Sequence, residues 1–105
     1  MNYKLSNIPN RTKKNRDIGL TMVMDKGLSL REAENLIESC ANFIDIIKLG
    51  FGTAIISNNV KKKIKLYQKN NIKVHVGGTL FEAFIIRGMF EDYIKFIEEL
   101  DLNTI

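Results

Sequence analysis

The stretch Val74-His75-Val76-Gly77-Gly78-Thr79-Leu80-Phe81-Glu82 decides the fold, because it holds the end of a strand, a turn and the start of a helix. Its β-branched residues predict a strand that ends at the two glycines. Thr79 and Glu82 have the spacing of a capping box, which predicts a helix with Thr79 as its N-cap. Glycines let a ligand approach the backbone, and the free N–H groups of a helix start attract anions. The stretch therefore predicts a βα unit with an anion-binding edge.

Two similar units precede this stretch. Ser29 and Glu32 form another capping box after the first predicted strand, and Gly50-Phe51-Gly52-Thr53 ends the second strand. Strands that alternate with helices predict an α/β fold with parallel strands and functional residues at their carboxyl ends. The predicted strands are residues 19–24, 43–49 and 72–76, with the start of a fourth at 103–105. The predicted helices after the second and third strands are residues 59–69, 80–87 and 90–100.

The composition is that of one globular domain of 105 residues, with 45% hydrophobic and 27% charged residues. No apolar run approaches the roughly 20 residues that a membrane-spanning helix needs, and the N-terminus has no apolar signal segment. We therefore expect no membrane partner. The single cysteine, Cys40, cannot form an internal disulfide, which favours a cytoplasmic protein. Cys40 falls on the apolar side of a predicted helix, which favours packing over a nucleophilic role.

The net charge of +4 comes mainly from two basic clusters, residues 11–16 and 61–65. Such clusters are compatible with nucleic-acid binding or with solvated surfaces. In the second cluster the helical spacing of Val60, Ile64 and Tyr67 predicts that the lysines between them face water. The sequence has no nucleic-acid-binding motif, so we expect no nucleic-acid partner. We interpret residues 1–17 as a basic N-terminal arm that leads into the first strand, where it can reach an anionic substrate.

Side-chain alternation along the strands predicts where three polar residues lie. If Leu20, Met22 and Met24 pack on helices, Asp25 points to the other face of the sheet. Lys48 and His75 occupy comparable positions on the next two strands, so the three are predicted to gather near one end of the sheet. A lysine within a strand is costly unless it is paired or exposed, which makes Lys48 a candidate functional residue.

Four sequence blocks together resemble the phosphosulfolactate synthase family. They are residues 19–27, 43–53, 63–67 and 77–82, in the family's order and spacing. The resemblance implies a (β/α)8 TIM barrel and a lyase that adds sulfite to phosphoenolpyruvate with Mg2+ to give (R)-2-phospho-3-sulfolactate, in coenzyme M biosynthesis. A barrel takes about 250 residues. Residues 18–105 therefore correspond to an N-terminal portion with about three to three and a half βα units.

The shortness of the chain leaves two functions open. One is a truncated or split synthase that needs a complementary C-terminal half or a homo-oligomer to act on phosphoenolpyruvate and sulfite. The other is a non-catalytic half-barrel remnant or assembly domain. An open parallel sheet with a bare edge favours association in either case.

By the resemblance, Lys48 and Lys26 are expected to bind anionic groups, and one of them to donate the proton. Asp25 is expected in acid–base catalysis or as a magnesium ligand, although a turn-forming role also explains it. Glu82 is a second candidate magnesium ligand, although the capping box also explains it. For substrate binding we expect Arg16 and the backbone N–H groups of Gly77, Gly78 and Thr79, whereas His75 is expected to pack.

Overall fold

The computed structural model describes residues 2–102, in which three strands alternate with helices. The strands are β1 (Met22–Asp25), β2 (Ile46–Leu49) and β3 (Lys73–Val76). The helices are α1 (Leu30–Cys40), α2 (Thr53–Ile56), α3 (Val60–Lys69), α4 (Gly78–Ile85) and α5 (Phe90–Leu100), and a 3-10 turn, η1 (Ala41–Phe43), follows α1. The fourth strand predicted at 103–105 lies outside the described residues.

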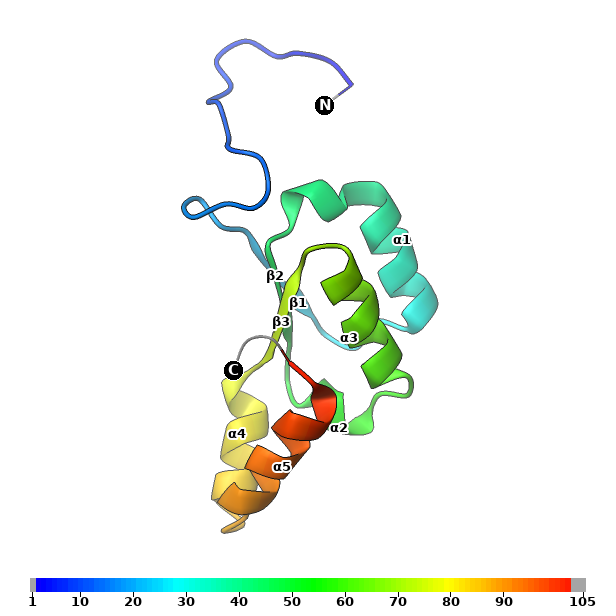
Figure 1. The fold of residues 1–105 in the computed structure, drawn as a ribbon, viewed down its shortest axis with the longest axis vertical. Helices are drawn as coiled ribbons and strands as arrows, with labels where there is room; N and C mark the ends of the chain where they lie inside the picture. The colour runs from blue at the N-terminus through cyan, green and yellow to red at the C-terminus, as the bar shows by residue number, and fades with distance from the viewer. Residues whose placement is uncertain (1, 103–105) are drawn as a thin grey trace.

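The three strands form one parallel sheet in the order β1-β2-β3. The predicted α/β fold is therefore confirmed, and the open sheet is consistent with part of a (β/α)8 barrel. Figure 1 shows α1 and α3 together on one side of the sheet, whereas α4 and α5 extend beyond the carboxyl ends of the strands. In the strand register, Met24, Lys48 and His75 lie side by side across the sheet.

The hydrophobic core lies between the sheet and its helices. In β2, Ile47 and Leu49 are buried, as alternation requires for the strand face that meets helices. Each fully buried aliphatic side chain contributes about 1.5–3 kcal/mol relative to an exposed one. The other core residues are Ala33, Ile44, Ala54, Ile64, Tyr67, Ile72, Val74, Val76, Leu80, Tyr93, Ile97 and Leu100. Cys40 packs against this core and donates its Sγ–H to the Leu36 carbonyl, so its predicted packing role is confirmed.

The face of the sheet away from α1 and α3 is uncovered. The side chains of the first strand that lie on this face differ from those expected from the sequence. Leu20, Met22 and Met24 are 51%, 53% and 40% exposed, whereas Val23 packs on the core and Asp25 is buried. The condition that Leu20, Met22 and Met24 pack on helices is not met. The predicted gathering of Asp25 with Lys48 and His75 is therefore wrong, because the buried polar partners of Asp25 lie on α3. Lys48 and His75 therefore share the uncovered face with Met24, and Asp25 does not join them.

Two predicted helix starts have different outcomes. The capping box of α1 is confirmed, because Ser29 Oγ accepts a hydrogen bond from the Glu32 N–H while the Glu32 carboxylate accepts one from the Ser29 N–H. The capping box at Thr79 is wrong. Gly77, in extended conformation, is the N-cap of α4, so Thr79 already lies inside the first turn. None of the described helices is long and apolar enough to cross a membrane.

Candidate active-site edge

The carboxyl ends of the strands carry the candidate site, and Lys48 is its central residue. The side chain of Lys48 lies across Gly77 on the neighbouring strand end. A Cβ atom at Gly77 would be 2.8 Å from Lys48 Cε and 3.7 Å from its Nζ, so only glycine leaves room for this arrangement. Lys48 is half-buried, and its ammonium has no hydrogen-bond or ion-pair partner among residues 2–102. Such an ammonium is available to an anionic ligand.

The N-terminus of α4 starts where the Lys48 side chain passes. Gly77, its N-cap, has no side chain to accept a hydrogen bond, and Gly78 and Thr79 are exposed in the first turn. The first N–H groups of a helix have no partner within the helix and carry partial positive charge. The structure therefore brings Lys48 together with the stretch from Gly77 to Thr79, although Thr79 is not the cap. The roles expected of these residues in catalysis and substrate binding stay predictions.

The loops after β1 and β2 meet at the same edge. Lys26 Nζ lies 5.8 Å from the centroid of the Phe51 ring, within reach of a cation–π interaction. Phe51 is exposed and has a φ of 55°, an unfavourable conformation for a bulky residue and one that is often found at functional sites. Thr53 Oγ1, in the first turn of α2, is buried without a hydrogen-bond partner among the described residues. Sequence reasoning did not single out Phe51 or this hydroxyl.

Asp25 is at the end of β1, where both of its carboxylate oxygens are occupied. Oδ1 accepts hydrogen bonds from the N–H groups of Gly27 and Leu28, at 2.8 and 2.7 Å. Oδ2 accepts one from the Tyr67 hydroxyl at 2.8 Å and pairs with Lys63 Nζ at 2.9 Å. Burial raises the pKa of Asp25, but these four donors outweigh burial and hold the pKa below its usual value.

These contacts bear on the expected magnesium site. A magnesium ion needs open oxygen ligands, usually carboxylates together with water. Asp25 is 1% exposed with four donors around it, so it does not fit that requirement. Glu82 is exposed on α4, and the described residues contain no group of three His, Cys, Asp or Glu side chains able to hold a metal ion. The magnesium role of Glu82 stays a prediction.

Lys63 and Tyr67 are the residues that sequence reasoning missed at this edge. Lys63 was expected to face water with its neighbours, but it is 1% exposed, so that expectation is wrong. Its ammonium reaches Asp25 and also donates to the Leu28 carbonyl at 2.8 Å. A signal was present, because Lys63 and Tyr67 are four residues apart and so share one face of α3. We call Asp25, Lys63 and Tyr67 the buried triad.

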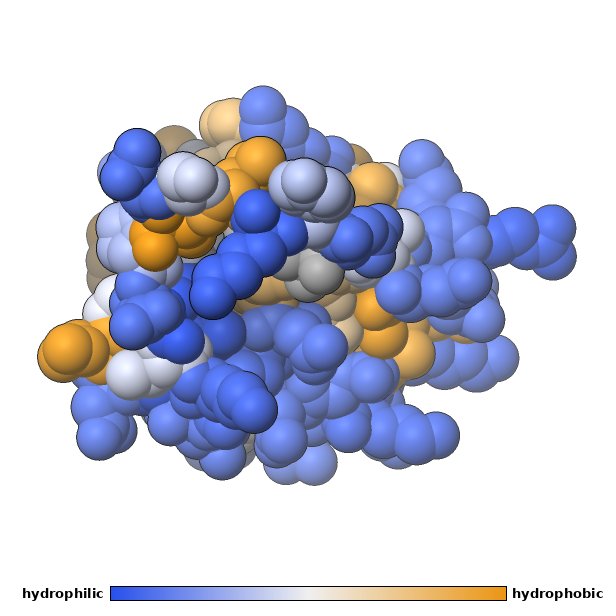
Figure 2. All heavy atoms as spheres, turned by 90° about the horizontal axis from the view of Figure 1, so that it is seen from above, coloured by the Kyte–Doolittle hydropathy of each residue, from blue (hydrophilic) through white to orange (hydrophobic). Residues whose placement is uncertain are grey.

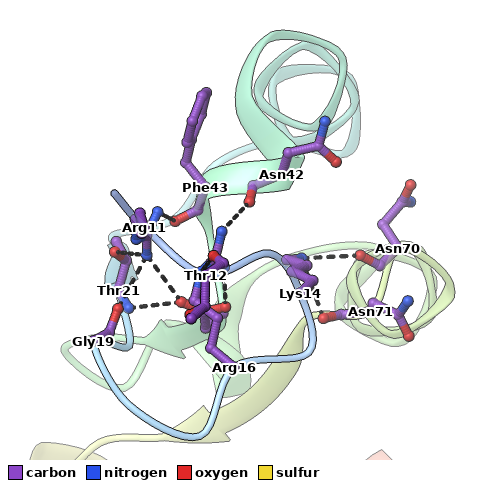
Figure 3. Close-up of polar contacts among 11 residues, drawn as sticks. Arg11, Thr12, Lys14, Arg16, Gly19, Thr21, Asn42, Phe43, Asn70 and Asn71 are labelled. Carbon is purple, nitrogen blue, oxygen red and sulfur yellow. Dashed lines mark hydrogen bonds and ion pairs between the residues drawn. The ribbon is translucent and has the colours of Figure 1, made fainter. Parts of the chain in front are cut away.

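The opposite edge of the sheet holds Arg16, away from Lys48. Arg16 pairs with Asp45 just before β2 and donates to the Asn42 carbonyl at 2.8 Å. Arg11 pairs with the other Asp45 oxygen at 3.2 Å and donates to Thr21 Oγ1 at 2.7 Å. Figure 3 shows these contacts converging from the N-terminal arm. We call Arg11, Arg16 and Asp45 the arm clamp. Arg16 therefore lies at the amino ends of the strands, and its contact with substrate stays a prediction.

Charged contacts hold the N-terminal residues against the segment before β2 and the end of α3. Burial raises the pKa of Asp45, but the Thr21 N–H, Arg16 and Arg11 outweigh it and hold the pKa below its usual value. Lys14 donates to the Asn70 and Asn71 carbonyls at 3.2 Å each, at the C-terminus of α3, where a cation is favourable. Seen from this end, hydrophilic residues cover most of the molecule and hydrophobic ones form separate patches (Figure 2).

Comparison with known proteins identifies a family whose match covers most of the chain. The family described as (2R)-phospho-3-sulfolactate synthase (ComA) matches residues 9–105. The chain belongs to the phosphosulfolactate synthase family. The family resemblance seen in the sequence is thus confirmed, and the match includes Lys26, Lys48 and the Gly77–Thr79 stretch.

Curated phosphosulfolactate synthases show how much of the family's length is present. The protein of Methanocaldococcus jannaschii is 38% identical over 89 residues, which are 83% of this chain and 36% of that protein. The protein of Methanothermobacter thermautotrophicus is 34% identical over 99 residues, 92% of this chain and 38% of that protein. That of Bacillus subtilis is 28% identical over 89 residues, 85% and 35% respectively. This chain therefore spans little more than a third of these phosphosulfolactate synthases.

Proposed function

We propose that this chain forms the first part of a phosphosulfolactate synthase active site, which adds sulfite to phosphoenolpyruvate to give (R)-2-phospho-3-sulfolactate. The observation that carries the proposal is the half-buried Lys48, whose side chain lies across Gly77 at the carboxyl edge and whose ammonium has no partner among the described residues. An anionic substrate supplies the counter-charge that this lysine otherwise lacks. Family membership supports the choice of anions.

In the proposed reaction, the sulfur of sulfite forms a bond to the methylene carbon of phosphoenolpyruvate. The π electron pair moves to the phosphate-bearing carbon and is shared with the adjacent carboxylate, and a proton then joins that carbon. Lys48 stabilises the developing negative charge, and Lys26 binds the phosphate or sulfonate. The backbone N–H groups of Gly78 and Thr79 bind another anionic oxygen. One of the two lysines delivers the proton.

Magnesium belongs to this proposal only through the family resemblance. Because the buried Asp25 does not fit a magnesium site, we assign no step of the chemistry to a metal held by the described residues. The proposed ligands of the ion are Glu82 and groups outside this segment.

We further propose that the uncovered face of the sheet needs a partner, either a polypeptide with the later barrel strands or a second copy of this chain. Leu20, Met22 and Met24 are exposed there beside Lys48 and His75. Parallel sheets are normally covered on both faces, and coverage also excludes water from an active site. The alternative of a non-catalytic half-barrel predicts association without activity.

The test begins with the purified chain, alone and mixed with the C-terminal barrel portion of a relative. Light scattering gives the assembly state, and phosphorus NMR follows phosphoenolpyruvate incubated with sulfite and Mg2+. We expect product only in an assembly that covers the sheet. Lys48→Met should lower kcat/KM by roughly 100-fold. The control Lys73→Met removes an exposed lysine at the amino end of β3 and should retain activity. Absence of product in every assembly, or full activity of Lys48→Met, contradicts the proposal.

A further inference from the structure

The buried triad connects helix α3 to the loop that carries Lys26. Asp25 receives the N–H groups of Gly27 and Leu28, so its carboxylate closes the turn around Lys26. Lys63 holds the same loop a second time, because its ammonium contacts both Asp25 and the Leu28 carbonyl. The backbone after Lys26 is therefore held by the Asp25 carboxylate and by Lys63, which is 35 residues from Leu28, and the Asp25 carboxylate is in turn contacted by Tyr67, 42 residues away.

Stability alone is a poor explanation for this cluster. Asp25 and Lys63 are each 1% exposed and Tyr67 is fully buried, so two charges and a hydroxyl have been removed from water. A buried ion pair is often no more stabilising than apolar residues of the same volume. Apolar residues, however, cannot hydrogen-bond the backbone of a turn. Both charges are used here to hold one short loop.

The side chain of Lys26 points in a defined direction from this loop. Lys26 is exposed, and its ammonium lies over the Phe51 ring on the neighbouring loop. Gly27 has a φ of 111°, a conformation open to glycine, and Thr53 Cγ2 lies 3.6 Å from the position of a Cβ there. The positive φ favours glycine at position 27, directly after Lys26.

We infer that Lys63 and Tyr67 are positioning residues, which act through Asp25 to fix the β1–α1 loop and direct Lys26 toward the anion-binding edge. This inference rests on the proposed function in one respect, which is that the Lys26 ammonium binds an anionic substrate. The fixed loop itself is independent of that function. Asp25 accordingly serves the site by holding the loop, and it does not touch the substrate.

The first measurement needs no ligand. Phe51 imposes a ring-current shift on the Hε protons of Lys26, which NMR detects and which Phe51→Leu calibrates. Tyr67→Phe removes one hydrogen bond to Asp25 at nearly constant volume, and Lys63→Met removes the ammonium. We expect both variants to lose much of this shift and to increase amide hydrogen exchange at Gly27 and Leu28 by about tenfold.

Matched controls separate this effect from a general loss of packing. Tyr93→Phe removes a hydroxyl from another buried tyrosine, one that packs on Phe81 and Phe84. Lys62→Met removes the exposed lysine adjacent to Lys63 on α3. Neither control should alter the Lys26 signal or the exchange of the loop amides.

A second measurement links the loop to the site. Phosphoenolpyruvate is titrated into the wild type, Tyr67→Phe, Lys26→Met and the double variant. We expect Tyr67→Phe to weaken binding about tenfold in the wild-type background and to have no further effect once Lys26 is Met. An equal effect in both backgrounds, or an unchanged Lys26 signal and loop exchange in both triad variants, overturns the inference. If the wild type binds no phosphoenolpyruvate either alone or in an assembly that covers the sheet, the proposed function fails, and the ligand-free measurement still decides the positioning role. If Lys63→Met does not fold, Tyr67→Phe decides it.

Discussion

Replacement of Asp25 by Asn tests the energetic role of the buried triad. The Asn carboxamide oxygen can accept from the N–H groups of Gly27 and Leu28, as the Asp25 oxygen Oδ1 does. Its NH2 group then faces the Tyr67 hydroxyl and the Lys63 ammonium, which are both donors in the wild type. The variant therefore leaves a buried positive charge without its counter-ion.

The size of the effect follows from the burial of both partners. Removal of one partner of a buried ion pair costs about 3–5 kcal/mol. Lys63 keeps its hydrogen bond to the Leu28 carbonyl at 2.8 Å, which places the expected loss near the lower end, about 3 kcal/mol. A typical domain has only about 5–15 kcal/mol of stability, so this loss is large.

Urea unfolding followed by circular dichroism measures the change. Asp17→Asn, at an exposed aspartate, is the control and should stay within about 0.5 kcal/mol of the wild type. In the double variant with Lys63→Met both charges are absent, so the loss should be smaller than the sum of the single losses by about 1 kcal/mol or more. A loss below about 1 kcal/mol for Asp25→Asn, or strict additivity, would refute the reasoning.

Three further predictions concern other parts of the molecule. Gly77→Ala should displace the Lys48 side chain, and NMR of the Lys48 Hε protons detects this change. The loss of stability should be small, because the Lys48 side chain is flexible. The control Gly78→Ala, where a Cβ meets nothing within 4 Å, should leave the Lys48 signal unchanged. Ser29→Ala should cost about 1 kcal/mol in urea unfolding, whereas Thr79→Ala should cost less than about 0.5 kcal/mol, because only the former side chain caps a helix. The carboxylates of the buried triad and the arm clamp have lowered pKa values, so the free energy of unfolding should be constant between about pH 5 and about pH 10 and fall as the pH drops through about 4 and below. The raised pKa of the triad's tyrosine predicts a second loss as the pH rises above about 10. A shifted Lys48 signal in Gly78→Ala would contradict the first of these predictions. Equal losses of stability in Ser29→Ala and Thr79→Ala would contradict the second. A free energy of unfolding that does not change with pH across either range would contradict the third.

The amino-acid sequence determined the order of elements and much of the candidate site. Apolar runs and glycines marked the three strands, and Ser29 with Glu32 marked the start of α1, because these signals act over a few neighbouring residues. The glycine pair after β3 predicted an anion-binding edge, because glycines let a ligand approach the backbone. Lys48 was found because a charge within a strand is costly and therefore conspicuous.

Only the tertiary structure decided which face each strand presents and what the buried charges contact. Both sets of alternating residues in β1 contain apolar side chains, so periodicity could not place Asp25 on the helix side. Its partner Tyr67 is 42 residues away, and Arg16 is 29 residues from Asp45, so no local pattern records either contact. Thr79 had the spacing of a cap but not its role, because the backbone at Gly77 starts the helix earlier. Local propensities thus set the elements, whereas the pairing of buried polar groups depends on packing between distant segments, and that pairing fixes the loop that carries Lys26.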